Sequence, residues 1–409
     1  MNFHINLNYK QIRFFFYGII SILISIYLIN LSNEKDSWFN FWYNFNVPKM
    51  WPPFADIDHI RNSLICRLNG IDPFITNPCD VSNTRYQYPV TWLHIFEILR
   101  LENFENYQVF LIASLSTLLF YYFFLIEITK KKINKIGLFF LFFSTSSCLL
   151  IERGNVDHII FILIFSLIIF SGYYSALFLI FLSSLLKIYP FFSFFYLIRS
   201  KYKILVTLIL MIVTIYFLYE ISLSKYIDKN HSIMAMSQTY GIQSITEGFF
   251  KVIEKKNILF LEEVQKNLIR LLASLIALFF AAYFFYRGTI SKIKINFKKN
   301  ENKEILFILG SSIYIGTYIF YSNIDYRLVF LFMTIPFLEN FEKKINYIYL
   351  FSVIIISNSF MFAYTPLTLE HILYTTLLYS IKLCIFIFLC FSLGLLSKDF
   401  FNLKKSNFI

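Results

Sequence analysis

The sequence is poor in charged residues for its length. Only 15% of its 409 residues are Asp, Glu, Lys or Arg, whereas 57% are hydrophobic and 21% are aromatic. An ordinary soluble domain carries about 25% charged residues. The composition therefore excludes a soluble globular protein and predicts an all-α membrane protein that crosses the bilayer many times.

The sequence also lacks the short signatures of several enzyme classes. It contains no Gly-rich phosphate loop, no dinucleotide-binding fingerprint and no pair of histidines four residues apart. Its six histidines are scattered, so we expect no histidine-built metal site. The net charge of +12 is expected to reflect membrane topology, and no nucleic acid partner is predicted.

Long apolar runs are abundant, and they predict a helical bundle of about ten to twelve transmembrane helices in one integral membrane domain, residues 1–409. A helix needs about twenty residues to cross a bilayer, so the shorter runs are expected to be broken, re-entrant or tilted. The first run follows Lys10 and Arg13 and is interpreted as a retained span, not a cleaved signal. The runs cover residues 14–31, 107–128, 136–151, 156–171, 173–186, 188–198, 204–220, 268–286, 305–321, 328–338, 346–362 and 372–396.

Basic residues gather in alternate connections between these runs. If the N-terminus is cytoplasmic, the cytoplasmic connections are short and hold more than half of the 37 Lys and Arg residues, in clusters such as KKKIN and RSKYK. This asymmetry predicts a cell-membrane protein with both termini in the cytoplasm. The opposite face then receives two large extracytoplasmic loops, residues 32–106 and 221–267.

Every other polar cluster falls on that extracytoplasmic face. Ionisable residues at a membrane are costly to place and commonly functional, and a shared face allows them to line one cavity. The clusters are Asp56 and Asp58, the run ERGNVD at residues 152–157, Lys187, and the run NIDYR at residues 323–327.

The first loop is expected to form a lid over this cavity. Residues 57–69 have apolar side chains near helical spacing, and a second amphipathic segment lies within residues 86–101. Asp56 would be the N-cap of the first helix, and capping alone is an alternative explanation for it. Cys66 and Cys79 are expected to form a disulfide if this face is oxidising, with two free thiols as the alternative.

Two basic residues on this face have competing interpretations. Arg153 is a candidate phosphate ligand, but it is equally explained by pairing with Glu152 or Asp157. Lys187 lies on the face that ordinary cytoplasmic anchors avoid, so it is either a phosphate ligand or a side chain that reaches lipid headgroups.

Two further basic residues lie near the end of the chain. Arg327 suits bidentate phosphate contact, with an ion pair to Asp325 as the alternative. Lys382, in the middle of the last long span, is expected to be buried against an acid, the alternative being a lipid-phosphate site.

The order of these motifs resembles the GT-C membrane glycosyltransferases, specifically glycosyltransferase family 87, whose members use polyprenyl-phosphate mannose or arabinose donors, and within it an uncharacterised bacterial branch. The resemblance extends through most of the chain, and the ordered set is more specific than any one motif. The matching features are Asp56, GIDPF at 70–74, YP at 88–89, GNVD at 154–157, KIYP at 187–190 and DYRL at 325–328.

The resemblance implies a GT-C-like fold and an inverting sugar transfer on the extracytoplasmic face. A hexose or pentose, mannose among them, would pass from a polyprenyl-phosphate carrier to a lipid or glycan acceptor. The resemblance implies that Asp56 is the general base, with Asp58 as the alternative. Residues 59–62 read HIRN where family members usually carry aromatic side chains, so the acceptor stays open.

The remaining roles follow from the same resemblance and from simple chemistry. A phosphate leaving group needs positive charge, which Lys187, Arg327 and Arg153 would supply. No cofactor and no divalent metal are expected. The supporting residues are predicted to be Glu152, Asn155, Asp157, Asp325 and Tyr326.

Two other functions stay open at this stage. A transporter or flippase of lipid-linked sugars would show inverted repeats and charges near the middle of the bilayer in both halves. A polysaccharide polymerase or ligase would share the membrane setting and the lipid-linked substrate.

Overall fold

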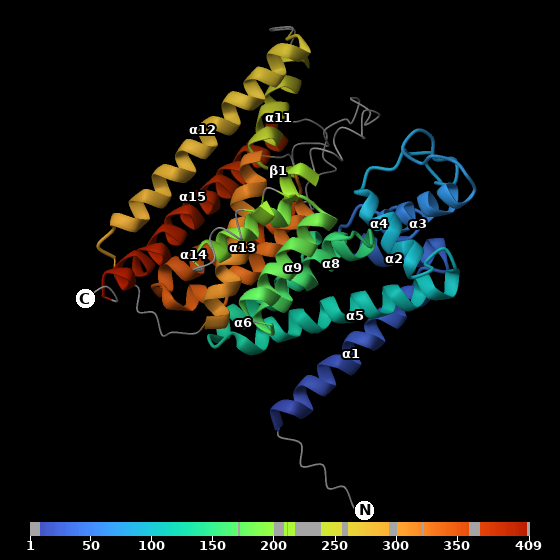
Figure 1. Cartoon of the computed structure of the whole chain (residues 1–409), viewed down its shortest axis with the longest axis horizontal. Helices are drawn as coiled ribbons and strands as arrows, with labels where there is room; N and C mark the ends of the chain where they lie inside the picture. The colour runs from blue at the N-terminus through green and yellow to red at the C-terminus, as the bar shows by residue number, and fades with distance from the viewer. Residues whose placement is uncertain are drawn as a thin grey trace, which may run out of the picture.

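The computed structural model describes residues 9–170, 172–199, 208–210, 212–216, 239–255, 261–293, 301–320, 323–359 and 369–406. Within these ranges all regular secondary structure is helical apart from two short strands, β1 (Thr239–Tyr240) and β2 (Asn323–Ile324), which pair antiparallel. Figure 1 shows long helices packed obliquely into one bundle, with α2, α3 and α4 gathered at one end. The predicted all-α class is confirmed.

Five helices are long and apolar enough to cross a bilayer. A sixth crossing arises if α6 (Lys132–Phe142) and α7 (Thr145–Glu152), which meet at a bend of 41°, form one broken span. The helices in the described part of the chain are thus those of a multi-pass membrane protein. The five helices are α1 (Tyr9–Leu31), α5 (Phe104–Ile128), α12 (Glu263–Ile290), α13 (Glu301–Phe320) and α15 (Leu369–Ser406).

The other predicted spans are shorter than the expected full crossings. At about 1.5 Å per residue, a 14-residue helix covers only about 21 Å of a hydrocarbon core about 30 Å thick. Within the described residues each of these elements is too short to cross the bilayer alone, as the short runs 188–198 and 328–338 had indicated. They are α8 (Asp157–Phe165) with η1 (Ser166–Ile168), α9 (Tyr173–Leu186), η2 (Tyr189–Arg199), η4 (Asp325–Thr334), η5 (Phe337–Asn340) and α14 (Lys343–Ser357).

Two predicted segments lie partly outside the described residues. Of the run 204–220, only residues 208–210 and 212–216 are described, and they are helical. Of the second large loop, residues 221–238 and 256–260 are not described. The described part of that loop contains β1, α11 (Ile242–Lys255) and the first turns of α12.

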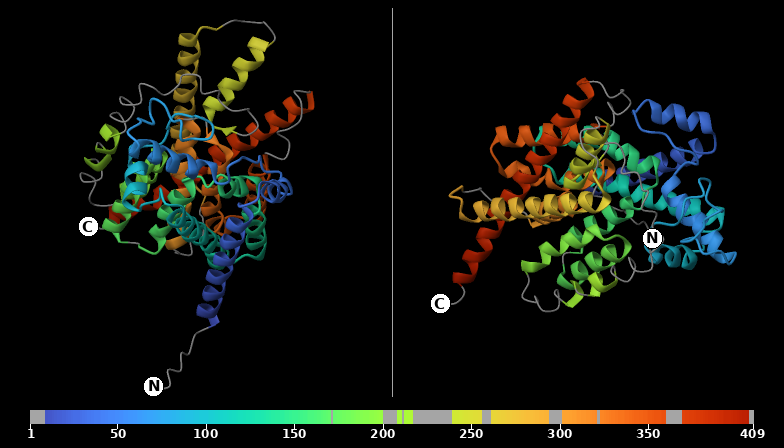
Figure 2. Two further views of the ribbon diagram at one scale, coloured as in Figure 1. Left: turned by 90° about the vertical axis from the view of Figure 1, so that its right-hand side faces the viewer. Right: turned by 90° about the horizontal axis from the view of Figure 1, so that it is seen from above.

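The helices pack through small residues and present apolar side chains outward. α12 lies along α15, and their backbones approach so closely that a Cβ on Gly288 or Gly394 would overlap the neighbouring helix. Such contacts are typical of helix pairs in membranes. α1 protrudes from the bundle in Figure 2, and its Phe15 is 68% exposed, as expected for a side chain that faces lipid.

The first loop is an ordered unit, not an open connection. It contains α2 (Lys35–Tyr43), α3 (Ala55–Leu68) and α4 (Val90–Ile98), and α3 packs against α4. The predicted disulfide between Cys66 and Cys79 is confirmed, with Cα atoms 5.7 Å apart. It ties the C-terminal end of α3 to the loop that leads toward α4.

The start of α3 differs from the sequence prediction. The helix begins at Ala55 with Phe54 as its N-cap residue, so Asp56 lies inside the first turn. The interpretation of Asp56 as an N-cap is wrong. Its side chain makes a tertiary contact instead of capping the helix, so capping does not explain an aspartate at this position.

Candidate active site

Backbone hydrogen bonds seat the first loop on the end of the bundle. The amide of Phe54 donates to the carbonyl of Glu152 at 3.1 Å, and the amide of Asp56 donates to the carbonyl of Arg153 at 2.9 Å. On the other side of the lid, the indole Nε1 of Trp92 in α4 donates to the carbonyl of Leu186, the last residue of α9, at 2.9 Å. The lid is therefore attached to two connections of the bundle.

Two unusual backbone conformations make this seating possible. Phe54 has φ of 54° and Gly154 has φ of 54°, both in the left-handed region. A Cβ at Gly154 would lie 2.8 Å from the Cβ of Phe54 and 3.1 Å from Cγ2 of Ile57. Glycine is thus required at position 154 for two reasons: it adopts the positive φ without strain, and its lack of a side chain lets α3 approach closely. The two turns together direct Asp56 toward the bundle.

Asp56 stands where the lid meets the bundle. Its carboxylate Oδ2 accepts a hydrogen bond from the side-chain amide of Asn155. Burial raises the pKa of Asp56 above its ordinary value, while the charge of Arg153 and the hydrogen bond from Asn155 oppose that rise. A carboxylate of raised pKa is a stronger base than an exposed aspartate, which suits it to accept a proton.

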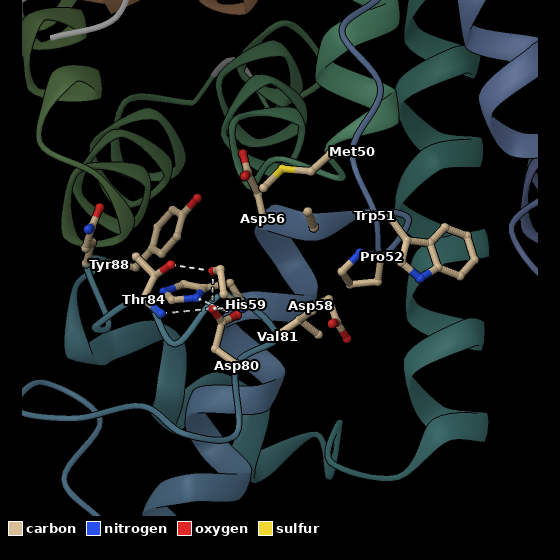
Figure 3. A pocket seen from close by; sticks show the side chains of 13 residues that line it. Met50, Trp51, Pro52, Asp56, Asp58, His59, Asp80, Val81, Thr84 and Tyr88 are labelled. Atoms are coloured by element: carbon tan, nitrogen blue, oxygen red, sulfur yellow. Dashed lines mark hydrogen bonds and ion pairs between the residues drawn. The ribbon is translucent and has the colours of Figure 1, made fainter. Parts of the chain in front are cut away.

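The carboxylate of Asp58, the alternative base, already bonds to side chains of its own helix. Arg61 pairs with Oδ1 at 3.2 Å, and the amide of Asn62 donates to Oδ2 at 2.8 Å. Figure 3 shows the carboxylates of Asp56 and Asp58 on different sides of α3. The geometry favours Asp56.

A buried cluster of opposite charges lies behind Asp56. Asp157, at the start of α8, pairs with Lys187 through Oδ1 and with Nε of Arg327 through Oδ2, the latter at 2.9 Å. The side-chain oxygen of Asn155 accepts from Nζ of Lys187 at 3.3 Å. Two cations share one carboxylate, so the trio of Asp157, Lys187 and Arg327 carries a formal charge of +1.

Asn155 connects this trio to Asp56. Its amide nitrogen faces Asp56 while its oxygen faces Lys187 and accepts the backbone N–H of Asp157 at 2.9 Å. Together with Arg327, residues from four connections, far apart in the chain, therefore meet at one place. The prediction that these clusters share one face is consistent with this arrangement.

A cavity of about 200 Å³ lies on the lid side of Asp56. Its wall is polar for a protein of this composition, and Tyr88 forms the boundary toward the basic trio, with Nζ of Lys187 5.4 Å from the ring centre. Figure 3 shows the side chains that line it. They include Trp51, Asp56, Asp58, His59, Asp80, Thr84 and Tyr88.

His59 and Asp80 are members of this wall that the sequence did not single out. Nδ1 of His59 lies 3.1 Å from Oδ1 of Asp80. Burial alone would raise the pKa of Asp80, but hydrogen bonds from His59, from Ser82 and from the backbone of Thr84 bring it below its ordinary value. The two residues are 21 positions apart in the chain, and no periodic pattern in the sequence predicts their contact.

Arg153 and Glu152 pair with each other, which is one of the alternatives raised for them. Nε of Arg153 lies 3.1 Å from Oε2 of Glu152, and Oε1 of Glu152 accepts the backbone N–H of Met50 at 2.8 Å. The Arg153 guanidinium also donates to the carbonyl of Pro48 at 3.4 Å. The pair holds the segment before α3 against the bundle.

Asp325 is not the partner of Arg327. It is fully buried against Lys382 of α15, with Nζ 2.9 Å from Oδ1 and 3.0 Å from Oδ2. Lys382 also donates to the carbonyl of Thr239 in β1 at 2.9 Å. The predicted burial of Lys382 against an acid is confirmed. Tyr326 lies 5.8 Å from the Arg327 guanidinium, measured to the ring centre.

The part of the chain that the structure describes contains no group of three or more His, Cys, Asp or Glu side chains able to hold a metal ion. Fold and site together define a polytopic helical membrane protein with a polar cavity beneath an ordered loop. Comparison with family models, with curated proteins and with solved structures finds no match.

Proposed function

We propose that the protein is a membrane glycosyltransferase of the GT-C type, which moves a sugar from a polyprenyl-phosphate carrier to an acceptor hydroxyl on the extracytoplasmic side. One observation carries the proposal. Asp56 lines a polar cavity on one side and is joined through Asn155 to the basic trio on the other. An acceptor in the cavity and a phosphate near the trio would place the reacting carbon between them.

Asp56 acts as the general base in this proposal. The acceptor oxygen attacks the anomeric carbon of the donor sugar, and its proton passes to the Asp56 carboxylate as the new C–O bond forms. The bond from the anomeric carbon to the phosphate oxygen breaks on the opposite face, so the configuration is inverted. The lipid phosphate leaves with the electron pair.

The basic trio stabilises the departing phosphate. Asp157 holds Lys187 and Arg327 in place yet neutralises only one of their two charges. A preorganised positive charge of this kind lowers the energy of a transition state in which negative charge develops on the leaving oxygen. No step requires a metal ion or a cofactor.

The proposal is tested with protein in membranes, a labelled polyprenyl-phosphate sugar and a lipid extract as the acceptor source. Wild-type protein is expected to transfer label to the acceptor fraction, and Asp56→Ala is expected to abolish transfer. Movement of the labelled lipid across the membrane without transfer would identify a flippase. Full activity of both Asp56→Ala and Asp58→Ala would refute a carboxylate base.

The sidedness in the proposal has its own test. In a variant lacking the free cysteines, Ser82→Cys at the cavity rim is expected to react with an impermeant thiol reagent added from outside intact cells. Lys132→Cys, at the start of α6, is expected to react only after the membrane is opened. Labelling of both positions from the same side would overturn the orientation.

A further inference from the structure

The cavity beside Asp56 has walls that suit one class of acceptor. Its lining is rich in hydrogen-bonding groups, among them Asp58, His59, Asp80, Ser82 and Thr84, in a chain that is 57% hydrophobic. Most of these groups already bond within the protein, but an alkyl or isoprenoid alcohol would leave Nε2 of His59 and the spare lone pairs of the carboxylates without a partner, and each polar atom so buried costs about 1–3 kcal/mol. A ligand with several hydroxyl groups would satisfy them.

The size of the cavity limits how much of the acceptor it holds. Pockets for drug-sized ligands span roughly 300–1,000 Å³, and this one is about 200 Å³. Its walls also include the aromatic side chains of Trp51 and Tyr88. A single sugar ring, with polar edges and an apolar face, matches this combination of volume, hydrogen-bonding groups and aromatic surface.

His59 is the best-defined hydrogen-bonding group in the wall. Asp80 fixes the ring through Nδ1, and the ring lies nearly parallel to that of Tyr86, with centres 6.0 Å apart and an angle of 18°. A carboxylate on Nδ1 selects the tautomer with the proton there and leaves Nε2 for a ligand. No described residue bonds to Nε2, so this nitrogen is available to a hydroxyl group.

Asp80 is itself held rigidly. Its Oδ2 accepts the backbone N–H groups of Ser82 at 3.2 Å and Thr84 at 3.1 Å. The residue before it, Cys79, is bonded to Cys66 of α3, the helix that carries His59. The disulfide and the turn therefore fix both members of the pair relative to Asp56.

From these observations we infer that the cavity binds the sugar headgroup of a glycosylated acceptor, and that His59, oriented by Asp80, determines its specificity by bonding a hydroxyl group of that sugar. The inference rests on the proposed function for the identity of the ligand as an acceptor. The binding site itself is independent of catalysis. Asp56 then takes the proton of a second hydroxyl group of the same sugar.

Direct binding tests the inference without any transfer reaction. The probes are n-octyl glycosides of glucose, mannose, galactose and N-acetylglucosamine, below their micellar concentrations, with 1-octanol as the apolar alcohol. Saturation-transfer NMR on full-length protein in lipid nanodiscs reports which probe is bound. At least one glycoside is expected to show saturation-transfer signals from its sugar ring, and an excess of the cognate free sugar, such as mannose, is expected to abolish them. Signals from 1-octanol are expected not to change when the free sugar is added.

Matched variants assign the signal to the pair. His59→Gln and Asp80→Asn are each expected to weaken binding at least about 10-fold, the scale of one lost hydrogen bond to a charged or charge-oriented group. His94→Gln is the control, because His94 lies in the same loop near Glu97, at 3.8 Å, and does not line the cavity. Asp56→Asn is expected to keep binding while losing transfer.

The outcomes separate the two proposals. Absence of binding for every glycoside, equal displaceable binding of 1-octanol, or unchanged affinity in both His59→Gln and Asp80→Asn would each overturn the sugar site. Glycoside binding that depends on His59 in a protein that transfers no sugar would uphold the site and refute the glycosyltransferase. An unchanged melting temperature in the variants shows that the loss of affinity is local.

Discussion

The side-chain amide of Asn155 donates a hydrogen bond to the carboxylate of Asp56, although 99 positions separate the two residues in the chain. One residue belongs to the lid and the other to the turn between α7 and α8. This contact joins the proposed base to the basic trio, because the oxygen of the same amide accepts from Lys187.

Removal of this amide is expected to shift the pH dependence of transfer. The hydrogen bond from Asn155 favours the ionised form and so opposes the rise in the pKa of Asp56 that burial causes. Asn155→Ala removes that support, the pKa rises further, and the acidic limb of the rate profile moves to higher pH. Rates measured across the acidic range reveal the shift.

The matched control for this experiment is Asn62→Ala. Asn62 donates to Asp58 as Asn155 does to Asp56. If Asp56 is the base, Asn62→Ala leaves the acidic limb in place. A shift with Asn62→Ala and none with Asn155→Ala would assign the base to Asp58.

Gly154→Ala is expected to loosen the lid and reduce transfer. An added methyl group would lie 2.8 Å from Cβ of Phe54, so α3 must move and Asp56 with it. Gly70→Ala is the control, since Gly70 also has a positive φ but has nothing within 4 Å of an added Cβ. In both variants the left-handed conformation of the new alanine destabilises the fold by about 1–2 kcal/mol. Equal activity losses in the two would show that contact with α3 is irrelevant.

The sequence predicted that these polar clusters share one face, because charge patterning indicates the sidedness of loops. The connections that carry Asp56, Asn155, Lys187 and Arg327 avoid the basic clusters, and positive charge on the other connections predicts which side is cytoplasmic. Loops on the same side of a compact bundle lie close to one another. Their convergence therefore follows from topology, even though the contacts themselves do not.

The individual partners could not be read from the sequence. Arg327 and Asp325 are two residues apart, yet in the η4 helix they serve different neighbours, Asp157 and Lys382. The pair of His59 and Asp80 depends on an irregular loop, whose path has no period. Span lengths were also less predictable, because apolar content alone does not distinguish a full crossing from a short helix buried among others.

Loss of the Lys187 ammonium is expected to weaken donor binding. Lys187→Gln should raise the KM for the polyprenyl-phosphate sugar roughly 10- to 100-fold, the scale of a lost hydrogen bond to a charged group. Arg327 still pairs with Asp157, which keeps that carboxylate compensated. Initial rates at varied donor concentration give the KM.

Lys303→Gln provides the control for Lys187→Gln. Like Lys187, Lys303 is a buried lysine paired with a carboxylate, that of Glu339. This pair lies away from the first loop, because Glu339 also accepts the backbone N–H of Lys130, just before α6. This variant is expected to lower the melting temperature without changing the donor KM. An increase in KM of the same size in both variants would attribute the effect to general destabilisation.

The ion pair between Asp325 and Lys382 is expected to be structural. Either Asp325→Leu or Lys382→Met alone leaves a buried unpaired charge, which costs about 3–5 kcal/mol, whereas the double variant removes both charges and should recover most of that loss. Thermal unfolding in mild detergent measures the difference. A double variant as unstable as the two single variants combined would show that the charges act independently.

The most direct measurement of the central claim compares Asp56→Asn with Asp58→Asn in a single assay of sugar transfer. The two variants remove one negative charge each, two residues apart, with almost no change of volume. We predict that Asp56→Asn lowers the transfer rate by about 10²- to 10⁴-fold, the usual contribution of a general base, while Asp58→Asn stays within about 10-fold of the wild type. Transfer at the wild-type rate by Asp56→Asn would contradict the account.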